Sequence, residues 1–280
     1  MRSLRIWSIL FVVVFTGLTL GYLSPLVSVH RSFRSRNLQP TGTLNDYKFA
    51  DAGTSELAVY YINLGSRLDR KKSIVKQLGF LGLPFSRMEA VDFRGNETAL
   101  RECWDEKDSQ RCAGKLGCKA SHMKVLELHE KDELLRSVVI FEDDFVWLGH
   151  VNPSRFPWVL KGFESLFPDW KVLGLSMNIM HQKLTNVSVQ LSKDIFHVSQ
   201  VTEISEAQTT HGYAVRASYI PVLLAVWREC DVTARLDIAI DQCWKPLQAQ
   251  GGWYAFSPQL GTQKPGFSDI ESMEVNYDIS

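Results

Sequence analysis

The chain has 280 residues, of which 45% are hydrophobic and 22% are charged. This length and composition are ordinary for a globular protein and allow one large α/β domain or two small ones. Its 31 basic and 31 acidic side chains give a formal net charge of zero. Because a nucleic-acid-binding protein normally presents a basic surface, this balance argues against a nucleic-acid partner.

An apolar run from Ile6 to Leu23 follows two basic residues, Arg2 and Arg5. A run of about 18 residues is near the lower limit for crossing a bilayer, and it is long for the apolar core of a signal peptide. We therefore predict a membrane-anchor helix over residues 1–29, with a cleaved signal peptide as the alternative. Arginines on both sides of the run leave its orientation undecided by the positive-inside rule.

Two further features favour a lumenal location for the rest of the chain. Asn96-Glu97-Thr98 and Asn186-Val187-Ser188 have the form of N-glycosylation acceptors. The five cysteines allow two local disulfides and one remaining thiol, although sequence alone does not fix the pairing: Cys103 with Cys112, Cys230 with Cys243, and Cys118 alone. These features predict a single-pass type II protein of the Golgi or endoplasmic reticulum membrane.

Residues 30–56 are polar and rich in turn-forming residues, which predicts a stem that does not fold alone. A globular domain is predicted over residues 57–280. Its first helix is expected to begin at Ser66-x-x-Asp69, a pattern similar to a capping box, and residues 94–113 are expected to form a loop. Apolar runs and alternation predict strands over 57–62, 85–91, 137–141, 171–176, 187–191, 212–215 and 253–256. Helical spacing predicts helices over about 66–81, 116–135, 156–166, 219–227 and 234–248.

The alternation of strands and helices predicts an α/β fold, with a mostly parallel sheet and helices on both faces. In such sheets, ligands bind beyond the carboxyl ends of the strands. Asn63, Asp92 and the triplet Glu142-Asp143-Asp144 all follow predicted strands. We therefore expect these side chains to line one crevice.

Glu142-Asp143-Asp144 directly follows a buried strand, Ser137 to Phe141. Three carboxylates at the end of a buried strand repel one another and lose hydration, which costs folding free energy. A divalent cation would relieve that cost, and carboxylate oxygens are the ligands that Mg²⁺ and Mn²⁺ prefer. The alternative is a solvated acidic turn, which explains most isolated triplets of this kind.

The chain resembles glycosyltransferase family 25, the lipooligosaccharide galactosyltransferase type that also includes the collagen hydroxylysine galactosyltransferases. The resemblance extends from about Val59 to Ile270. In chain order it is carried by Tyr61-Ile62-Asn63-Leu64 with Arg67, Asp69 and Arg70; Gly82-Leu83-Pro84-Phe85; Ala90-Val91-Asp92; Gly117-Cys118-x-x-Ser121-His122; Glu142-Asp143-Asp144; Gly212-Tyr213-Ala214; Pro258-x-x-x-x-Gln263; and Ser268-Asp269-Ile270. Each motif is weak alone, and the ordered set is fairly specific.

The resemblance implies a GT-A-type nucleotide-binding fold, a UDP-sugar donor that is usually UDP-galactose, and inversion at the anomeric carbon. It implies a bound Mn²⁺ or Mg²⁺ with Glu142 and Asp144 as ligands. It further implies donor contacts by Asn63, Arg67, Asp92, His122 and Asp143. An inverting enzyme needs a base for the acceptor hydroxyl, and the resemblance implies Asp241 for this role. Asp269 is the second candidate for contact with the acceptor.

The chain departs from the family pattern at three places. Gly65 stands where the family usually has Asp, Lys115 stands where it commonly has Glu, and the Val-Asp-Gly turn is extended to Val91-Asp92-Phe93-Arg94-Gly95. The metal motif is intact.

Most of the candidate residues also have a structural alternative. Asn63 can close a turn, Asp92 and Asp241 can cap a helix or loop, and His122 can be a buried structural histidine. A non-catalytic relative that acts in adhesion or binding is the alternative function. The membrane leader and neutral charge argue against a third possibility, a nucleotidyltransferase or metal nuclease. The acceptor stays open among a protein, a glycan and a lipid.

Overall fold

The computed structural model describes residues 42–43, 56–97, 109–189, 199–230, 239–270 and 273–276. All of them belong to one structural unit that spans Gln39–Ser280. The predicted membrane anchor over residues 1–29 and the predicted disulfide partner Cys103 lie outside these ranges. Within the described ranges, no helix combines the length and the apolar character needed to cross a bilayer.

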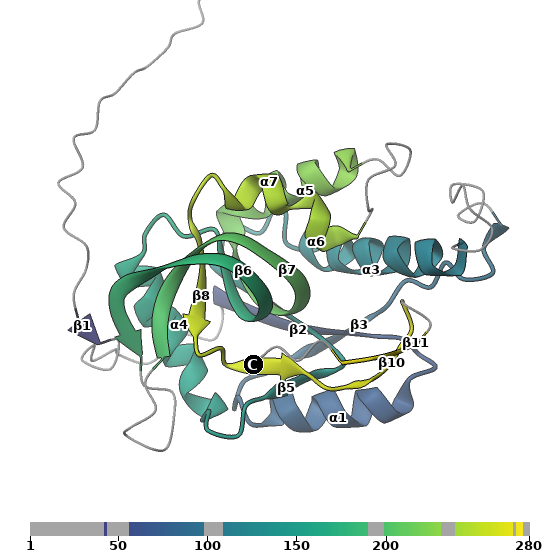
Figure 1. The fold of residues 1–280 in the computed structure, drawn as a ribbon, viewed down its shortest axis with the longest axis horizontal. Coiled ribbons are helices and arrows are strands. Elements are labelled where there is room, and N and C mark those ends of the chain that lie inside the picture. Colours follow the sequence, from purple (N-terminus) through teal and green to yellow (C-terminus); the bar gives the residue numbers. More distant parts are fainter. Residues whose placement is uncertain are drawn as a thin grey trace, which may run out of the picture. The chain divides into compact units, whose positions relative to one another are not determined.

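A seven-stranded mixed sheet forms the centre of this unit (Figure 1). The strands lie in the order β1 (Gly42–Thr43), β6 (Val172–Val189), β8 (Trp253–Ser257), β7 (Ser199–Arg216), β4 (Ser137–Glu142), β2 (Leu57–Asn63) and β3 (Ser86–Glu89). β2 is parallel to both β3 and β4, and β6 is parallel to β1 and β8. Every antiparallel pairing described for this sheet involves β7. The prediction of a mixed α/β fold around a mostly parallel sheet is confirmed, with β7 as the exception.

Strand β4 is buried on both faces. Val139 and Phe141 pack into one core and Val138 and Ile140 into the other, because successive side chains of a strand point to opposite faces. The first core is covered by α1 (Leu68–Gly79) and α4 (Phe156–Leu166). The second is covered by α3 (Ser109–Glu127), α5 (Ile220–Glu229), α6 (Ile240–Cys243) and α7 (Lys245–Gln248). Figure 1 shows these helices on opposite sides of the sheet, as predicted.

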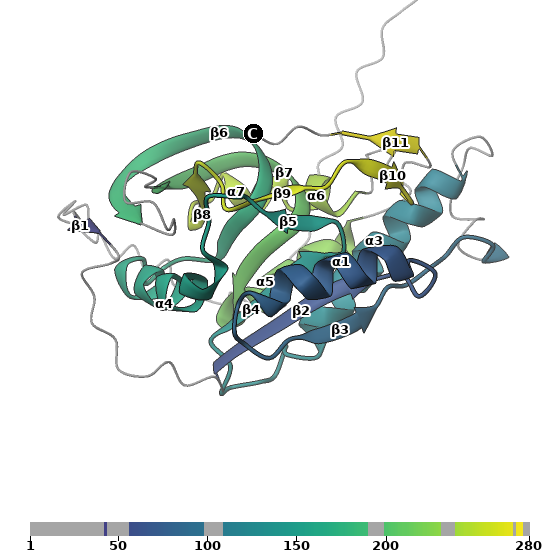
Figure 2. The same ribbon diagram turned by 90° about the horizontal axis from the view of Figure 1, so that it is seen from below.

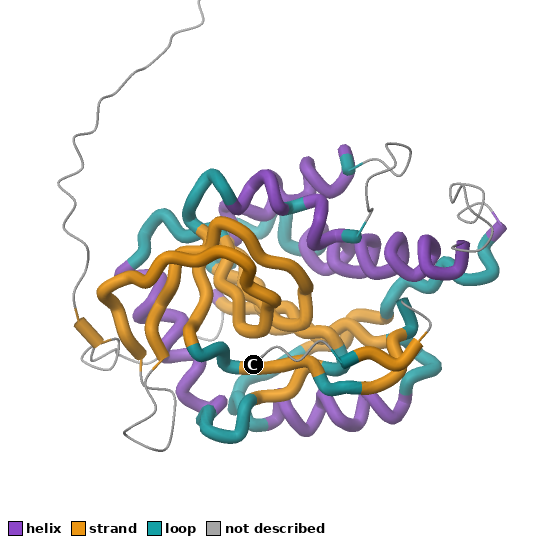
Figure 3. Tube along the Cα trace, in the orientation of Figure 1, coloured by secondary structure: helices purple, strands orange, loops and turns teal. Residues whose placement is uncertain are grey.

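The strands predicted separately over 171–176 and 187–191 are not separate. Residues 172–189 form the single strand β6, and the predicted strand over 212–215 is the end of the equally long β7. The two strands pair as a curved ribbon with several register shifts, which bend such ribbons (Figure 3). Residues 180–184 are exposed. Because no core covers this part, its side chains lack the apolar pattern that predicts a strand, although the backbones of β6 and β7 remain paired.

The helix boundaries also differ from the prediction. Helix α1 begins at Leu68 after Arg67, whose side chain makes no capping hydrogen bond. The prediction of a capping box is wrong. Both Asp69 oxygens instead bind the Arg67 guanidinium, at 3.1 Å. The predicted helix over 234–248 is interrupted at Trp244, between α6 and α7, and residues 231–238 lie outside the described ranges.

Helix α3 begins at Ser109, so part of the predicted loop over 94–113 is helical. The missed residues, 109–113, are mostly polar, which led to the prediction of a loop. Two glycines follow in the helix, Gly114 and Gly117. Both lie where the helix approaches other backbone closely: a Cβ on Gly114 would lie 3.0 Å from the Ile270 Cα, and one on Gly117 would overlap the Val91 carbonyl oxygen. The helix packs at this distance because glycine has no side chain.

Replacing Gly117 with alanine should therefore lower the free energy of unfolding by about 1–3 kcal/mol, as expected for overpacking. Gly79→Ala is the matched control, because its Cβ would meet open space at the end of α1. That change should raise stability by about 0.5–1 kcal/mol. Denaturant unfolding of both variants measures the difference. Equal stability of the two variants would contradict the close packing of α3.

Two short strand pairs, absent from the prediction, carry the C-terminal segment back toward the sheet. β5 (Phe145–Trp147) pairs with β9 (Gly261–Gln263) beside α1, and β10 (Gly266–Ser268) pairs with β11 (Met273–Val275) (Figure 2). Two 3₁₀ turns, Pro153–Arg155 and Ala217–Tyr219, precede α4 and α5. The pairing of β9 with β5 fixes the C-terminal segment next to the acidic triplet.

The cysteine prediction is confirmed where the structure describes it. Cys230 and Cys243 form a disulfide that joins the end of α5 to α6. Cys112 is also disulfide-bonded, and Cys118 is free. The two glycosylation acceptors, Asn96 and Asn186, are both exposed.

Candidate active site

A cavity of about 330 Å³ opens where β2, β3 and β4 end. Its lining includes eight of the residues selected from the sequence: Asn63, Asp92, His122, Glu142, Asp143, Asp144, Asp241 and Asp269. Arg67 reaches the cavity through its ion pair with Asp269. The expected convergence of polar residues at the carboxyl ends of the strands is therefore confirmed.

Glu142 ends β4, and Asp143 and Asp144 form the turn to β5, which is not a solvated turn. Asp143 is 8% exposed and Asp144 is 7% exposed. Asn63, at the end of β2, donates a 2.7 Å hydrogen bond to Asp143. Arg70 bridges the two aspartates at 3.0 and 3.1 Å. These contacts hold the carboxylates in fixed positions inside the fold.

Burial changes the titration of the triplet. It raises the pKa of Asp143 to about 6, assisted by the neighbouring charge of Asp144 and opposed by Asn63 and Arg70. Burial also raises the pKa of Asp144, and the Glu142 charge adds to this effect. Burial also favours a higher pKa for Glu142. Hydrogen bonds and nearby positive charge outweigh this effect and hold the pKa of Glu142 below its ordinary value; they come from His122, His211 and Thr210. The three carboxyl groups therefore have different proton affinities.

The two oxygens of Asp144 have different surroundings. Oδ2 accepts hydrogen bonds from Arg70 at 3.1 Å and Gln263 at 3.0 Å. Oδ1 is buried and has no hydrogen-bond partner among the residues that the structure describes. An unsatisfied buried carboxylate oxygen is costly, and it needs a cation or donor to compensate it.

Such a cation would find further ligands beside Asp144. Glu142, Asp144 and His211 each offer an atom within 4.8 Å of the others. His211 comes from β7, and the antiparallel register that pairs Phe141 with Gly212 places His211 opposite Glu142. Two carboxylates are ligands that Mn²⁺ and Mg²⁺ prefer, and the added imidazole favours a transition metal such as Mn²⁺. The residues present therefore fit a metal ion.

His122 lies on α3 and is almost completely buried. Its Nδ1 shares a 2.7 Å hydrogen bond with the Tyr213 hydroxyl, and its Nε2 lies 3.4 Å from a Glu142 oxygen. Thr210 donates a hydrogen bond to the same glutamate. His122 thus faces the acidic triplet.

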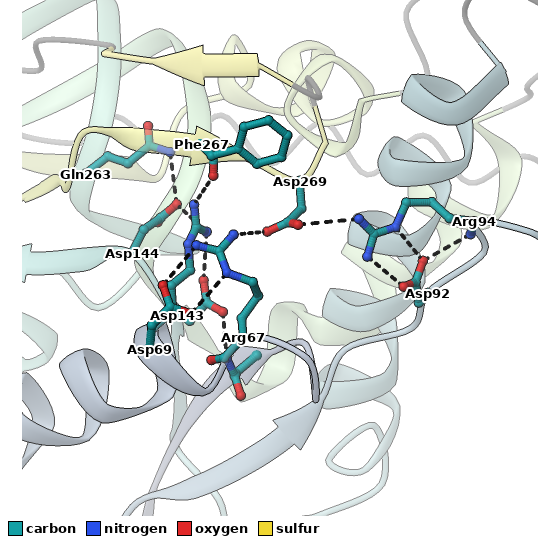
Figure 4. A network of polar contacts seen from close by, with 11 residues as sticks. Arg67, Asp69, Asp92, Arg94, Asp143, Asp144, Gln263, Phe267 and Asp269 are labelled. Atoms are coloured by element: carbon teal, nitrogen blue, oxygen red, sulfur yellow. Dashed lines mark hydrogen bonds and ion pairs between the residues drawn. The ribbon is translucent and has the colours of Figure 1, made fainter.

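Asp241 and Asp269, the two candidates for contact with the acceptor, both line the cavity. Asp241, on α6, accepts a 2.9 Å hydrogen bond from the backbone N–H of Thr209. Asp269 is held by Arg67 through one oxygen and by Arg94 at 3.4 Å through the other (Figure 4). Both oxygens of Asp269 are therefore occupied by guanidinium groups.

Asp92 caps a loop, which is the structural role considered for it as an alternative to donor binding. Its Oδ1 accepts from the backbone N–H of Arg94 at 3.0 Å, which closes the extended turn, and both of its oxygens bind the Arg94 guanidinium. Arg94 lowers the pKa of Asp92, chiefly through these hydrogen bonds. Asp92 thus lines the cavity and forms an ion pair with Arg94, which forms a second ion pair with Asp269.

A comparison with protein families identifies the chain. The model of glycosyltransferase family 25 (LPS biosynthesis protein) matches residues 56–244. This chain belongs to glycosyltransferase family 25. The matched part contains the acidic triplet, His211 and Asp241, while Gln263 and Asp269 lie beyond it.

Other comparisons give remote similarities. No curated protein sequence matches the chain. Among solved structures, it is similar to a UDP-glucose pyrophosphorylase complexed with UDP-glucose, at 9% identity and a TM-score of 0.38 over 80% of this chain and 93% of that chain. It is also similar to a glycosyltransferase involved in the glycosylation of the major capsid of PBCV-1, at 10% identity and a TM-score of 0.39 over 77% and 96% of the two chains.

Sequence analysis assigned no role to several residues of this family 25 site, among them Arg70, His211 and Gln263. Arg70 and Gln263 were part of the resembling motifs, which could have singled them out. Their contacts with Asp144 span 74 and 119 residues. His211 carried no signal, because its position beside Glu142 depends on the antiparallel pairing of β7.

Proposed function

We propose that this family 25 member is an active, metal-assisted glycosyltransferase with a GT-A-type fold. It transfers a sugar, which we propose to be galactose, from a UDP-sugar to an acceptor hydroxyl on a protein, glycan or lipid, with inversion. The observation that carries the proposal is the buried Asp144, whose Oδ1 lacks a hydrogen-bond partner within the described ranges and whose carboxylate belongs to a cluster of three ligand side chains.

Glu142, Asp144 and His211 would hold the Mn²⁺ or Mg²⁺ ion. When bound, the ion neutralises negative charge on the diphosphate of the donor and of the leaving UDP. Arg70 and Gln263 hold Oδ2 of Asp144 and so fix the orientation of the carboxylate. Fixed partners of this kind tune metal ligands and orient them. This division of roles between the two Asp144 oxygens supports metal binding.

Guanidinium groups at the cavity supply positive charge for the donor diphosphate. Arg70 and Arg94 line the cavity, and Arg67 stands behind Asp269. Arginine suits phosphate recognition because its planar fork donates two parallel hydrogen bonds. Asn63 contributes by fixing Asp143 beside Arg70.

Asp241 is the better candidate for the base that takes the proton of the acceptor hydroxyl. It lines the cavity, and its Oδ2 accepts a hydrogen bond from the backbone N–H of Thr209. Asp269 is engaged by Arg67 and Arg94, so we assign it to holding the C-terminal segment against the cavity.

The enzyme is proposed to work in the Golgi or endoplasmic reticulum lumen, anchored by the apolar segment in residues 1–29 as a single-pass type II protein. The disulfide between Cys230 and Cys243 suits an oxidising compartment. The exposure of Asn96 and Asn186 suits their use as glycosylation sites.

The test is release of UDP from a panel of UDP-sugars by the full-length protein with Mn²⁺. The panel contains UDP-galactose, UDP-glucose, UDP-N-acetylglucosamine and UDP-N-acetylgalactosamine. We expect UDP release from UDP-galactose above that from the other donors, and its loss on addition of a chelator. Absence of both UDP binding and turnover with every donor would overturn the proposal and favour the non-catalytic alternative. Turnover that is insensitive to chelation would overturn the metal assignment alone.

A further inference from the structure

A second cluster of ligand atoms shares the cavity with the proposed catalytic metal site. Cys118 Sγ, a ring nitrogen of His122 and a carboxylate oxygen of Glu142 lie within 4.8 Å of one another. All three residues line the cavity. Thiol, imidazole and carboxylate form a softer ligand set than the two carboxylates and imidazole of the first cluster.

The His122 side chain is aimed into this cluster. It is 1% exposed, and its Nε2 lies 3.4 Å from a Glu142 oxygen without a well-aligned hydrogen bond in the described parts of the chain. The bond between Nδ1 and the Tyr213 hydroxyl fixes the ring so that Nε2 faces Glu142. A histidine that ligates a metal is usually held in this way through its other ring nitrogen.

The distance between two of these atoms suits zinc. Zinc bonds of about 2.1 Å to nitrogen and oxygen, at a tetrahedral angle, place the two ligand atoms about 3.4 Å apart. His122 Nε2 and the Glu142 oxygen are 3.4 Å apart. Three protein ligands on a tetrahedral ion leave a fourth position for water or substrate from the cavity.

We propose that Cys118, His122 and Glu142 form a soft-metal site that takes Zn²⁺ and inhibits the enzyme. Binding forms a bond between sulfur and zinc, and the thiol proton is released to solvent. Glu142 belongs to both clusters, so zinc draws this carboxylate away from Asp144 and His211. Two divalent cations a few ångströms apart also repel each other. The inhibition rests on the proposed function, whereas zinc binding does not.

Cobalt(II) is the probe for binding, because thiolate ligation gives a charge-transfer band in the near ultraviolet. Full-length protein with Co²⁺ should show this band, and Zn²⁺ should remove it by displacement. Cys118→Ser should abolish the band. Asp144→Asn, which alters the other cluster only, should keep it. A wild-type protein without the band, or a Cys118→Ser protein that retains it, would overturn the proposal.

A second measurement needs no variant. Cys118 is free and partly buried beside the cavity, so a small alkylating reagent can report on its thiol by peptide mass spectrometry. Zn²⁺ should slow alkylation of Cys118 by about tenfold or more, whereas the same concentration of Mn²⁺ should not. Equal alkylation rates with and without Zn²⁺ would contradict the site.

Inhibition is measured last. The zinc concentration that halves activity should rise at least about tenfold in Cys118→Ser, because even the loss of a residue that only supports a metal ligand lowers affinity by about tenfold to a hundredfold. An unchanged value would show that zinc inhibits elsewhere and would overturn the inhibitory role. Because the cobalt and alkylation measurements use no donor, failure of sugar transfer and failure of zinc binding are distinguishable.

Discussion

Asp144→Asn is expected to reduce sugar transfer on the order of a thousandfold. The substitution keeps the shape of the side chain but removes the charge that the ion requires. Charge neutralisation by a metal contributes several kcal/mol to a transition state, and each 1.36 kcal/mol corresponds to a factor of ten in rate. UDP release from the preferred donor measures the activity, and electron paramagnetic resonance of Mn²⁺ measures ion binding.

Asp169→Asn is the matched control, because Asp169 is exposed and lies outside the cavity lining. It should retain both activity and Mn²⁺ binding. The Asp144→Asn protein should remain folded, since asparagine can still accept hydrogen bonds from Arg70 and Gln263. A folded Asp144→Asn protein with more than a tenth of wild-type activity would remove Asp144 from the metal site.

Arg70→Met should have the second largest effect, this time on stability. Arg70 is the guanidinium that bridges Asp143 and Asp144, and it also donates a 2.7 Å hydrogen bond to the Phe267 carbonyl. Removing one partner of a buried ion pair leaves uncompensated charge and typically costs about 3–5 kcal/mol. Denaturant unfolding of the full-length protein without divalent ions should show a loss of this size.

Arg228→Met is the control for this loss. Arg228 also binds two carboxylates, Glu127 and Glu130, but its side chain is 45% exposed. Water screens such a surface pair, so its removal should leave stability nearly unchanged. Adding Asp143→Asn to Arg70→Met should restore part of the lost stability, because it removes one of the two buried carboxylates that have lost their guanidinium partner. Similar losses in Arg70→Met and Arg228→Met would show that the bridge contributes no more than a surface pair.

Both expected effects come from the burial of acidic side chains at the site. The fold buries Asp143 and Asp144 at a cost, and Arg70 offsets part of that cost in the protein without metal. Arg70 binds Oδ2 of Asp144, so the buried Oδ1 stays available for an ion. The same arginine ties the carbonyl of Phe267, on β10, to the acidic triplet. Arg70 therefore links the proposed metal site to the C-terminal segment.

The sequence by itself determined the features that depend on neighbours along the chain. A run of β-branched and aromatic residues followed by three acids indicated a buried strand with carboxylates at its end, and β4 has this form. Short loops between cysteines favoured the pairing of Cys230 with Cys243. The ordered motifs indicated family 25, which the family comparison confirms.

Only the tertiary structure decided which side chains meet at the triplet. His211 lies beside Glu142 because β7 runs antiparallel to β4, an exception in a mostly parallel sheet. Gln263 and Asp269 arrive from the C-terminal segment, which the pairing of β9 with β5 brings to the cavity. Hydrophobic periodicity reports which face of a strand is buried, but it does not encode strand order or direction. The surroundings of each acidic oxygen, and therefore its chemistry, follow from the order and direction of the strands.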